Sequence, residues 1–240
     1  MLRLCAQASS RLRMPAGVAV FCSLVMFAVP AGAQAPAGVC PPPAATSEST
    51  PPTTLPLTNP LSPAPEQLVA CVGSQPITGA TFSHWAAIAR RSEEPSPKAV
   101  RTASKHHAPS AGEAINEAMG FLISSDWVLG EATDLNIHVT EGEVLHTFNR
   151  TRTQQFPKRK EFKAFLRQSG ETVTDLLFRV RLNLTSTRIQ KHVLAGHRGA
   201  HRRQRALKRF VHDFKLKWEA QTYCDAGYAT SDCGHVQASL

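Results

Sequence analysis

Residues 192–205, HVLAGHRGAHRRQR, place three histidines and several arginines in one short stretch. His197 and His201 stand four residues apart, the spacing that puts two metal ligands on one face of a helix. A glycine lies between them, however, and no Asp, Glu or Cys nearby completes a set of three or four ligands. His106 and His107, in a proline-flanked loop, are weaker candidates still. We therefore predict no metal site and interpret these histidines as solvated side chains.

The same stretch opens a strongly basic region. Residues 191–218 contain nine Lys or Arg and a single acid, Asp213. Clustered cations suit phosphate groups, but these cations fall between apolar positions, as on the solvated face of an amphipathic helix. The N-terminal signal described below also argues against a nucleic-acid partner. Two interpretations remain: a plain solvated face, or a face for an anionic envelope component such as lipid headgroups or a teichoic-type polymer.

Catalytic signatures are missing from the sequence. There is no nucleophile elbow, no HExxH motif and no paired-carboxylate arrangement, and no glycine-rich phosphate loop occurs. Ser, His and Asp are present but scattered, which carries no information about catalysis. We predict no catalytic residue and no cofactor.

The first 35 residues are typical of a secretory signal. Arg3, Arg11 and Arg13 form a basic start, and residues 16–29 form an apolar segment too short to span a bilayer comfortably. Small residues within positions 31–35 then supply a cleavage site. We predict an exported, envelope-associated protein, with an uncleaved N-terminal anchor as the alternative.

Export changes what the cysteines can do. Four of the six cysteines lie after the signal, and an even number in an oxidising compartment favours disulfides. Cys224 and Cys233 enclose a short loop, CDAGYATSDC, and are predicted to pair. Cys40 either reaches Cys71 or stays free; the sequence leaves both open.

Residues 36–66 are predicted to form a disordered or polyproline tether. Ten prolines occur among Ala, Ser and Thr, with one acid before position 66 and no base. Such a composition buries too little apolar surface to offset the entropy of ordering. Folding is therefore expected to begin near Gln67.

The rest of the chain shows mainly helical patterns. LVACV and PIT indicate a short strand and an extended segment around a Gly-Ser turn. A helix capped by Thr81 is expected through Arg91. Residues 113–132, preceded by a cap at Ser110, are apolar on more than one side, which is typical of a central buried helix.

Later helices carry their own start and stop signals. Thr140 and Glu143 form a capping box that opens a helix with Val144, Leu145 and Phe148 directed inward. Further signals predict a helix from Pro157 to the C-cap Gly170, one opened by Thr172 or Thr174, and a last one over residues 202–221. We predict a mainly α fold with a short N-terminal strand or hairpin and a closing C-terminal helix. Its parts are a helical domain over residues 67–194, a short bridge over residues 195–201, and the C-terminal helix with its Cys-bounded tail over residues 202–240.

The order of these features resembles the SurA/PrsA-type foldases. The segments that carry the likeness are VACVGSQPITGATFSHW, AMGFLISSDWVLGEATDLNIHVTEGEV, KEFKAFLRQSGETVTDLLFRVRLNL and RALKRFVHDFKLKWEAQTYCDAGYATSDC. The last is similar to the C-terminal helix and paired cysteines of actinobacterial members. Together they cover residues 68–233.

The resemblance implies a chaperone module that cradles unfolded polypeptide. In these foldases a parvulin-type prolyl isomerase domain, on the order of 90 residues, is inserted before the C-terminal helix. Here only LAGHRGA stands at that point, so the family's catalytic residues have no positions to occupy. We therefore expect the basic stretch to be a bridge that replaces the insert.

These observations predict an exported, non-enzymatic protein that holds unfolded or newly secreted polypeptides. Loose recognition by apolar side chains would suit many clients. The candidate client-binding residues are Met119, Phe148, Phe156, Phe162 and Phe165. Two alternatives remain: a prolyl isomerase, as family membership suggests, and a structural module bound to anionic envelope components through the basic helix.

Overall fold

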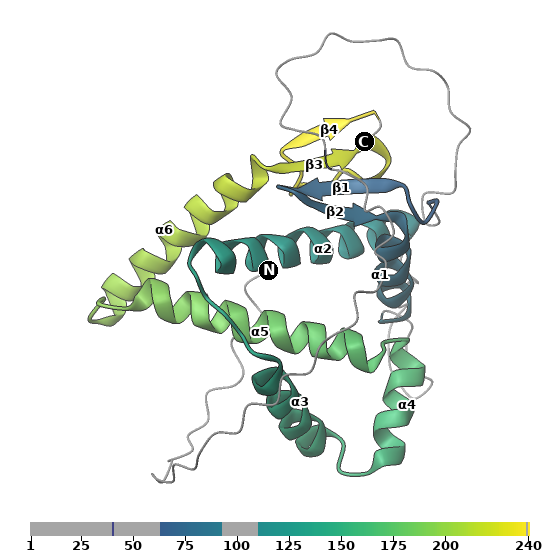
Figure 1. The fold of residues 1–240 in the computed structure, drawn as a ribbon, viewed down its shortest axis with the longest axis horizontal. Coiled ribbons are helices and arrows are strands. Elements are labelled where there is room, and N and C mark those ends of the chain that lie inside the picture. The colour runs from purple at the N-terminus through teal and green to yellow at the C-terminus, as the bar shows by residue number, and fades with distance from the viewer. Residues whose placement is uncertain (1–39, 41–62, 93–109, 239) are drawn as a thin grey trace, which may run out of the picture. The chain divides into compact units, whose positions relative to one another are not determined.

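The computed structural model describes residues 40, 63–92, 110–238 and 240, which belong to one unit of the chain, Pro36–Leu240 (Figure 1). The elements in these residues are β1 (Leu68–Val72), β2 (Gln75–Thr78), α1 (Gly79–Ser92), α2 (Ala111–Asp134), α3 (Glu141–Gln155), α4 (Arg159–Ser169), α5 (Val173–Leu194), α6 (Ala200–Glu219), β3 (Thr222–Asp225), the 3-10 turn η2 (Ala226–Tyr228) and β4 (His235–Gln237). The predicted mainly α fold with an N-terminal hairpin and a closing C-terminal helix is confirmed. The predicted signal, most of the tether, and His106 and His107 lie outside the described residues.

The four strands form one sheet in the order β2-β1-β3-β4. β1 pairs antiparallel with both neighbours, so that Cys71 stands opposite Pro76 on β2 and Tyr223 on β3. β4 then adds parallel to β3. Strands β3 and β4 were not predicted from the sequence, because TYCD and HVQ are too short to show a strand period. The first and the last strand of the described residues therefore belong to the same sheet.

Two disulfides lie on this sheet. Cys224 pairs with Cys233 as predicted, with Cα atoms 5.9 Å apart, and holds the short loop between β3 and β4. Cys40 pairs with Cys71, with Cα atoms 5.8 Å apart, which resolves the alternative that the sequence left open. The second bond attaches the predicted tether to β1.

Local capping chemistry sets the helix ends. The side chains of the N-cap and of the third helical residue exchange hydrogen bonds with each other's backbone N–H at three helices, in the pairs Ser110–Glu113, Thr140–Glu143 and Thr172–Asp175. Gly170 ends α4 with a φ of 74°, a left-handed conformation that favours glycine. These caps confirm the predicted signals and select Thr172 over Thr174.

Several predicted helix starts were wrong by two or three residues. α1 begins at Gly79, because the hydroxyl of Thr78 accepts a hydrogen bond from the N–H of Thr81 and takes the capping place assigned to Thr81. α4 begins at Arg159 rather than Pro157, and α6 begins at Ala200 rather than residue 202. The bridge between α5 and α6 therefore shortens to residues 195–199.

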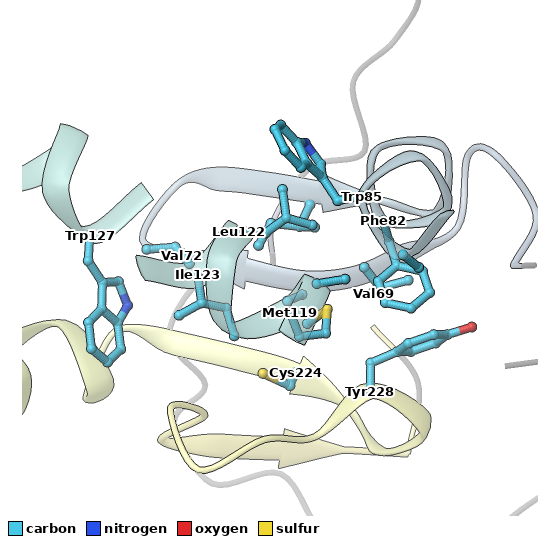
Figure 2. Packing of buried hydrophobic residues seen from close by; sticks show 14 of the residues in the cluster. Val69, Val72, Phe82, Trp85, Met119, Leu122, Ile123, Trp127, Cys224 and Tyr228 are labelled. Atoms are coloured by element: carbon cyan, nitrogen blue, oxygen red, sulfur yellow. The ribbon is translucent and has the colours of Figure 1, made fainter. Parts of the chain in front are cut away.

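The main core lies between the sheet, α1 and α2 (Figure 2). α2 is the central helix, as predicted, and contributes Met119, Leu122, Ile123 and Trp127. Phe82 of α1 meets Tyr228 edge-on, with ring centroids 4.9 Å apart. None of the helices in the part of the chain described here has the length and apolar character needed to cross a bilayer.

The C-terminal end of α6 docks on α2 through one tryptophan. The ring of Trp218 lies against Gly130, and its Nε1 donates a hydrogen bond to the buried Glu131 at 2.8 Å. Lys217 bonds both Glu131, at 2.6 Å, and Asp134, at 2.7 Å. Burial disfavours the charge on Lys217, but these bonds outweigh it and hold its pKa above the ordinary value. This contact brings the chain back to the sheet.

We predict that Gly130→Ala loosens this docking. A Cβ at Gly130 would lie 2.1 Å from Cη2 of Trp218, so the indole must move. Overpacking of this kind costs about 1–3 kcal/mol of unfolding free energy, more than alanine gains in a helix interior. Urea unfolding measures the loss.

Gly112→Ala in the same helix is the matched control. No atom lies within 4 Å of a Cβ built there, so the substitution should stabilise the protein by up to about 1 kcal/mol. If Gly130→Ala also stabilises the protein, the Trp218 contact does not constrain α6.

We also predict a pH-dependent cost from Asp126 on α2. Burial raises the pKa of this carboxyl from 3.8 to about 6. The folded state therefore binds the proton more tightly than the unfolded state, and stability falls as the pH rises from about 4 to about 6. Asp126→Asn should raise the unfolding free energy at neutral pH by about 3 kcal/mol, and this gain should vanish below about pH 4.

Denaturant unfolding at a series of pH values tests this expectation. Glu66→Gln, which removes an exposed carboxylate instead, should change the free energy by less than about 0.5 kcal/mol at every pH. A pH-independent gain in Asp126→Asn would contradict the assignment to burial of the charge.

Candidate functional site

A cavity of about 500 Å³ lies among α1, α2, α4 and α5. Its apolar wall consists of the side chains Trp85, Ile88, Ala89, Ala118, Phe121 and Phe165, and its polar rim of Arg91, Glu117, Gln168, Ser169, Glu171 and Arg179. Arg91, Gln168 and Arg179 are exposed, so the cavity opens to solvent on their side. Apolar walls with a few polar groups at the rim are typical of ligand-binding pockets.

Arg179 of α5 organises the aromatic wall. Its guanidinium lies 5.0 Å from the ring centroid of Trp85 and 4.6 Å from that of Phe121. The two rings are themselves 4.2 Å apart. The Nε of Arg179 bonds Glu171 at 2.7 Å, which fixes the direction of the guanidinium while leaving its face on the rings. The wall thus consists of two tilted rings with one paired cation beside them.

The turn between α4 and α5 positions this wall. Gly170 permits a close approach, since a Cβ there would lie 2.6 Å from Nη1 of Arg91. Asp175 caps α5 and also bonds Nε2 of His84 at 2.9 Å, which joins α5 to α1. Burial opposes ionisation of Asp175, yet hydrogen bonds from Thr172 and His84 outweigh it and lower its pKa. The ionised carboxylate therefore links the two helices that carry Arg179 and Trp85.

Four of the five predicted client-binding residues come together beside this cavity. Phe156 lies at the end of α3, with its ring centroid 5.7 Å from Phe162 and 5.0 Å from Phe165 on α4. Phe148 of α3 lies 6.1 Å from Phe162. We call these four residues the phenylalanine cluster. Phe162 is mostly buried, and the other three are partly exposed. Phe165 also lines the cavity, so it belongs to both the cluster and the cavity wall.

Met119 does not join them. It is 0 % exposed and lies in the main core with Leu122 and Ile123, so it cannot contact a client on the surface (Figure 2). The sequence could not show that Met119 lies in the core, because core and surface positions look alike on a helix that is apolar nearly all round. Leu145, predicted to face inward on α3, is 47 % exposed.

The histidines of the basic stretch stay apart. His197 lies in the bridge and His201 in the first turn of α6, and both are exposed. Within the ranges that the structure describes, no group of three His, Cys, Asp or Glu side chains is placed to hold a metal ion.

Two important side chains were not singled out from the sequence. Phe121 and Arg179 stand 58 residues apart and meet only because α2 packs on α5. Trp85 lies on the apolar face of α1, and the same face also forms part of the cavity wall. An aromatic residue beside a core position gives no signal for such a role.

No family model, curated protein or solved structure matches the chain. Function must therefore be inferred from the site itself.

Proposed function

We propose that the protein is an exported, chaperone-like module that binds unfolded or newly secreted polypeptides without isomerising them. The observation that carries the proposal is the aromatic cavity of about 500 Å³ with the phenylalanine cluster beside it. Exposed apolar surface rimmed by charges commonly marks a binding site for another chain.

The cavity, of about 500 Å³, is large enough to receive an aromatic or long aliphatic side chain. The rings of Trp85 and Phe121, tilted 44° to each other beside Arg179, offer an apolar surface to such a side chain. The rim offers both charges, Arg91 and Glu171, which can meet the backbone or polar residues that flank such a side chain. Recognition of this kind selects apolar segments without requiring one sequence.

The exposed phenylalanines extend this apolar surface. On α4 only Phe162 is buried. A helix with so few buried residues belongs to the less stable part of a fold and can adjust to different partners. The proposed client therefore lies across the cavity and the partly exposed members of the phenylalanine cluster.

Other features support the proposal independently. The order of motifs resembles the SurA/PrsA-type foldases, and only residues 195–199 join α5 to α6 where those proteins carry their isomerase. Two disulfides agree with an oxidising compartment.

We predict that the protein suppresses aggregation of heat-denatured citrate synthase, measured by light scattering. Phe165→Asp should abolish most of this suppression, because it places a charge in the apolar wall. The affinity for a fluorescent peptide rich in Phe and Leu should fall at least about tenfold.

Leu216→Asp is the matched control, since it adds the same charge at a side chain that is 56 % exposed on α6. Gln168→Trp fills the cavity from its exposed rim without removing a buried residue, and it should also weaken peptide binding. Circular dichroism checks that each variant folds. No suppression by the wild type in stoichiometric excess, or turnover in a protease-coupled proline-peptide assay, would contradict the proposal.

A further inference from the structure

The joint between α5 and α6 carries an unusual concentration of positive charge. Residues 188–209, which we call the basic elbow, contain eight Lys or Arg, three His and no acid. Figure 1 shows that α5 and α6 meet there, away from the sheet. Most of these cations are exposed, including Arg198, Arg202, Arg205 and Arg209.

Few of these cations are neutralised by the protein. Arg188 bonds Glu143 and the carbonyl of His138, and Nε of Arg203 donates to the carbonyl of His197. Among the described residues, no carboxylate forms a salt bridge with the remaining arginines and lysines of the basic elbow. These seven like charges repel one another, so an external anion would stabilise this end of the molecule.

Several hollows lie at the basic elbow. One hollow of about 490 Å³ is lined by Arg202, Arg205 and Arg209, with Val193 and Phe210 as its apolar part. Asp213 also lines it, so three cations face one carboxylate there. Two further hollows, lined by residues that include Lys191, lie around the bridge. Each combines cations with aliphatic groups, so each could receive a phosphate group that is attached to an apolar body.

The occupant that fits this arrangement is an anionic lipid surface. A nucleic acid presents its phosphates as a fixed ladder, which matches one row of cations. Here the cations come from both helices and from the bridge, and the hollows between them are also lined by apolar residues such as Val193, Leu194 and Phe210. Lipid headgroups move independently within a bilayer, so those that face the projecting α5–α6 joint can each meet an exposed cation (Figure 1).

We propose that the basic elbow binds the phosphate headgroups of an anionic phospholipid bilayer. This surface is separate from the aromatic cavity, so the inference goes beyond the proposed client binding. Each Lys or Arg close to such a bilayer strengthens binding severalfold, and salt weakens it.

The test is co-sedimentation of the protein with vesicles of phosphatidylcholine and phosphatidylglycerol in equal amounts. We expect binding at low salt, much weaker binding at about 0.15 M salt, and none to pure phosphatidylcholine. Replacing Arg202, Arg205 and Arg209 together by Gln should weaken binding about 100-fold.

The matched control replaces Arg159, Lys160 and Lys163 of α4 by Gln. This variant makes the same change in net charge at three exposed positions outside the basic elbow. Vesicle binding should change less than about threefold. Equal losses in both triple variants would overturn the proposal, because net charge alone would then explain binding. So would binding to duplex DNA without binding to vesicles. Client binding is read out separately by light scattering, so either proposal can fail alone.

Discussion

The pairing of β3 with β1 is the constraint on which the rest of the structure depends. β1 has a partner strand on each side, so its backbone hydrogen bonds are complete only when the end of the chain has returned to it. Six helices must therefore begin and end at one small sheet. Trp218 and Thr222 make this return specific: the first docks on Gly130, and the second accepts a hydrogen bond from Nε1 of Trp127 at 2.8 Å. The disulfides of Cys71 and Cys224 then hold the paired strands to neighbouring segments.

Local chemistry made much of the helical fold predictable. At three helices the N-terminus is capped by a hydroxyl followed three residues later by a carboxylate, and a left-handed glycine ends a fourth helix. Each of these signals lies within about four residues of sequence. The sheet closure was not predictable in this way. β3 and β4 are four and three residues long; β3 becomes a strand because β1 offers a free edge, and β4 then pairs with β3. The partner of β3 lies about 150 positions away, and sequence patterns report mainly near neighbours.

The candidate site also contains residues that the sequence predicted and residues that it did not. The phenylalanines of α3 and α4 were predicted as a surface, and they meet because both helices bring them to one junction. Arg179 was not predicted, because its role depends on two rings from α1 and α2. Met119 was a candidate client-binding residue because a helix apolar nearly all round shows no outer face, and it lies in the core. In each case the deciding fact is which helix lies opposite, and that is a property of the tertiary fold.

α5 carries both proposed binding surfaces on one element. Arg179 lines the cavity near the start of this helix, and Lys191 lies in the basic elbow near its end. The twelve residues between them span about 18 Å along a helix, more than twice the Debye length of about 8 Å at physiological salt. Charge at the elbow is therefore screened at the cavity. A bilayer at one end would neither attract nor repel a polypeptide at the other, and α5 would act as a spacer that holds the client off the membrane surface.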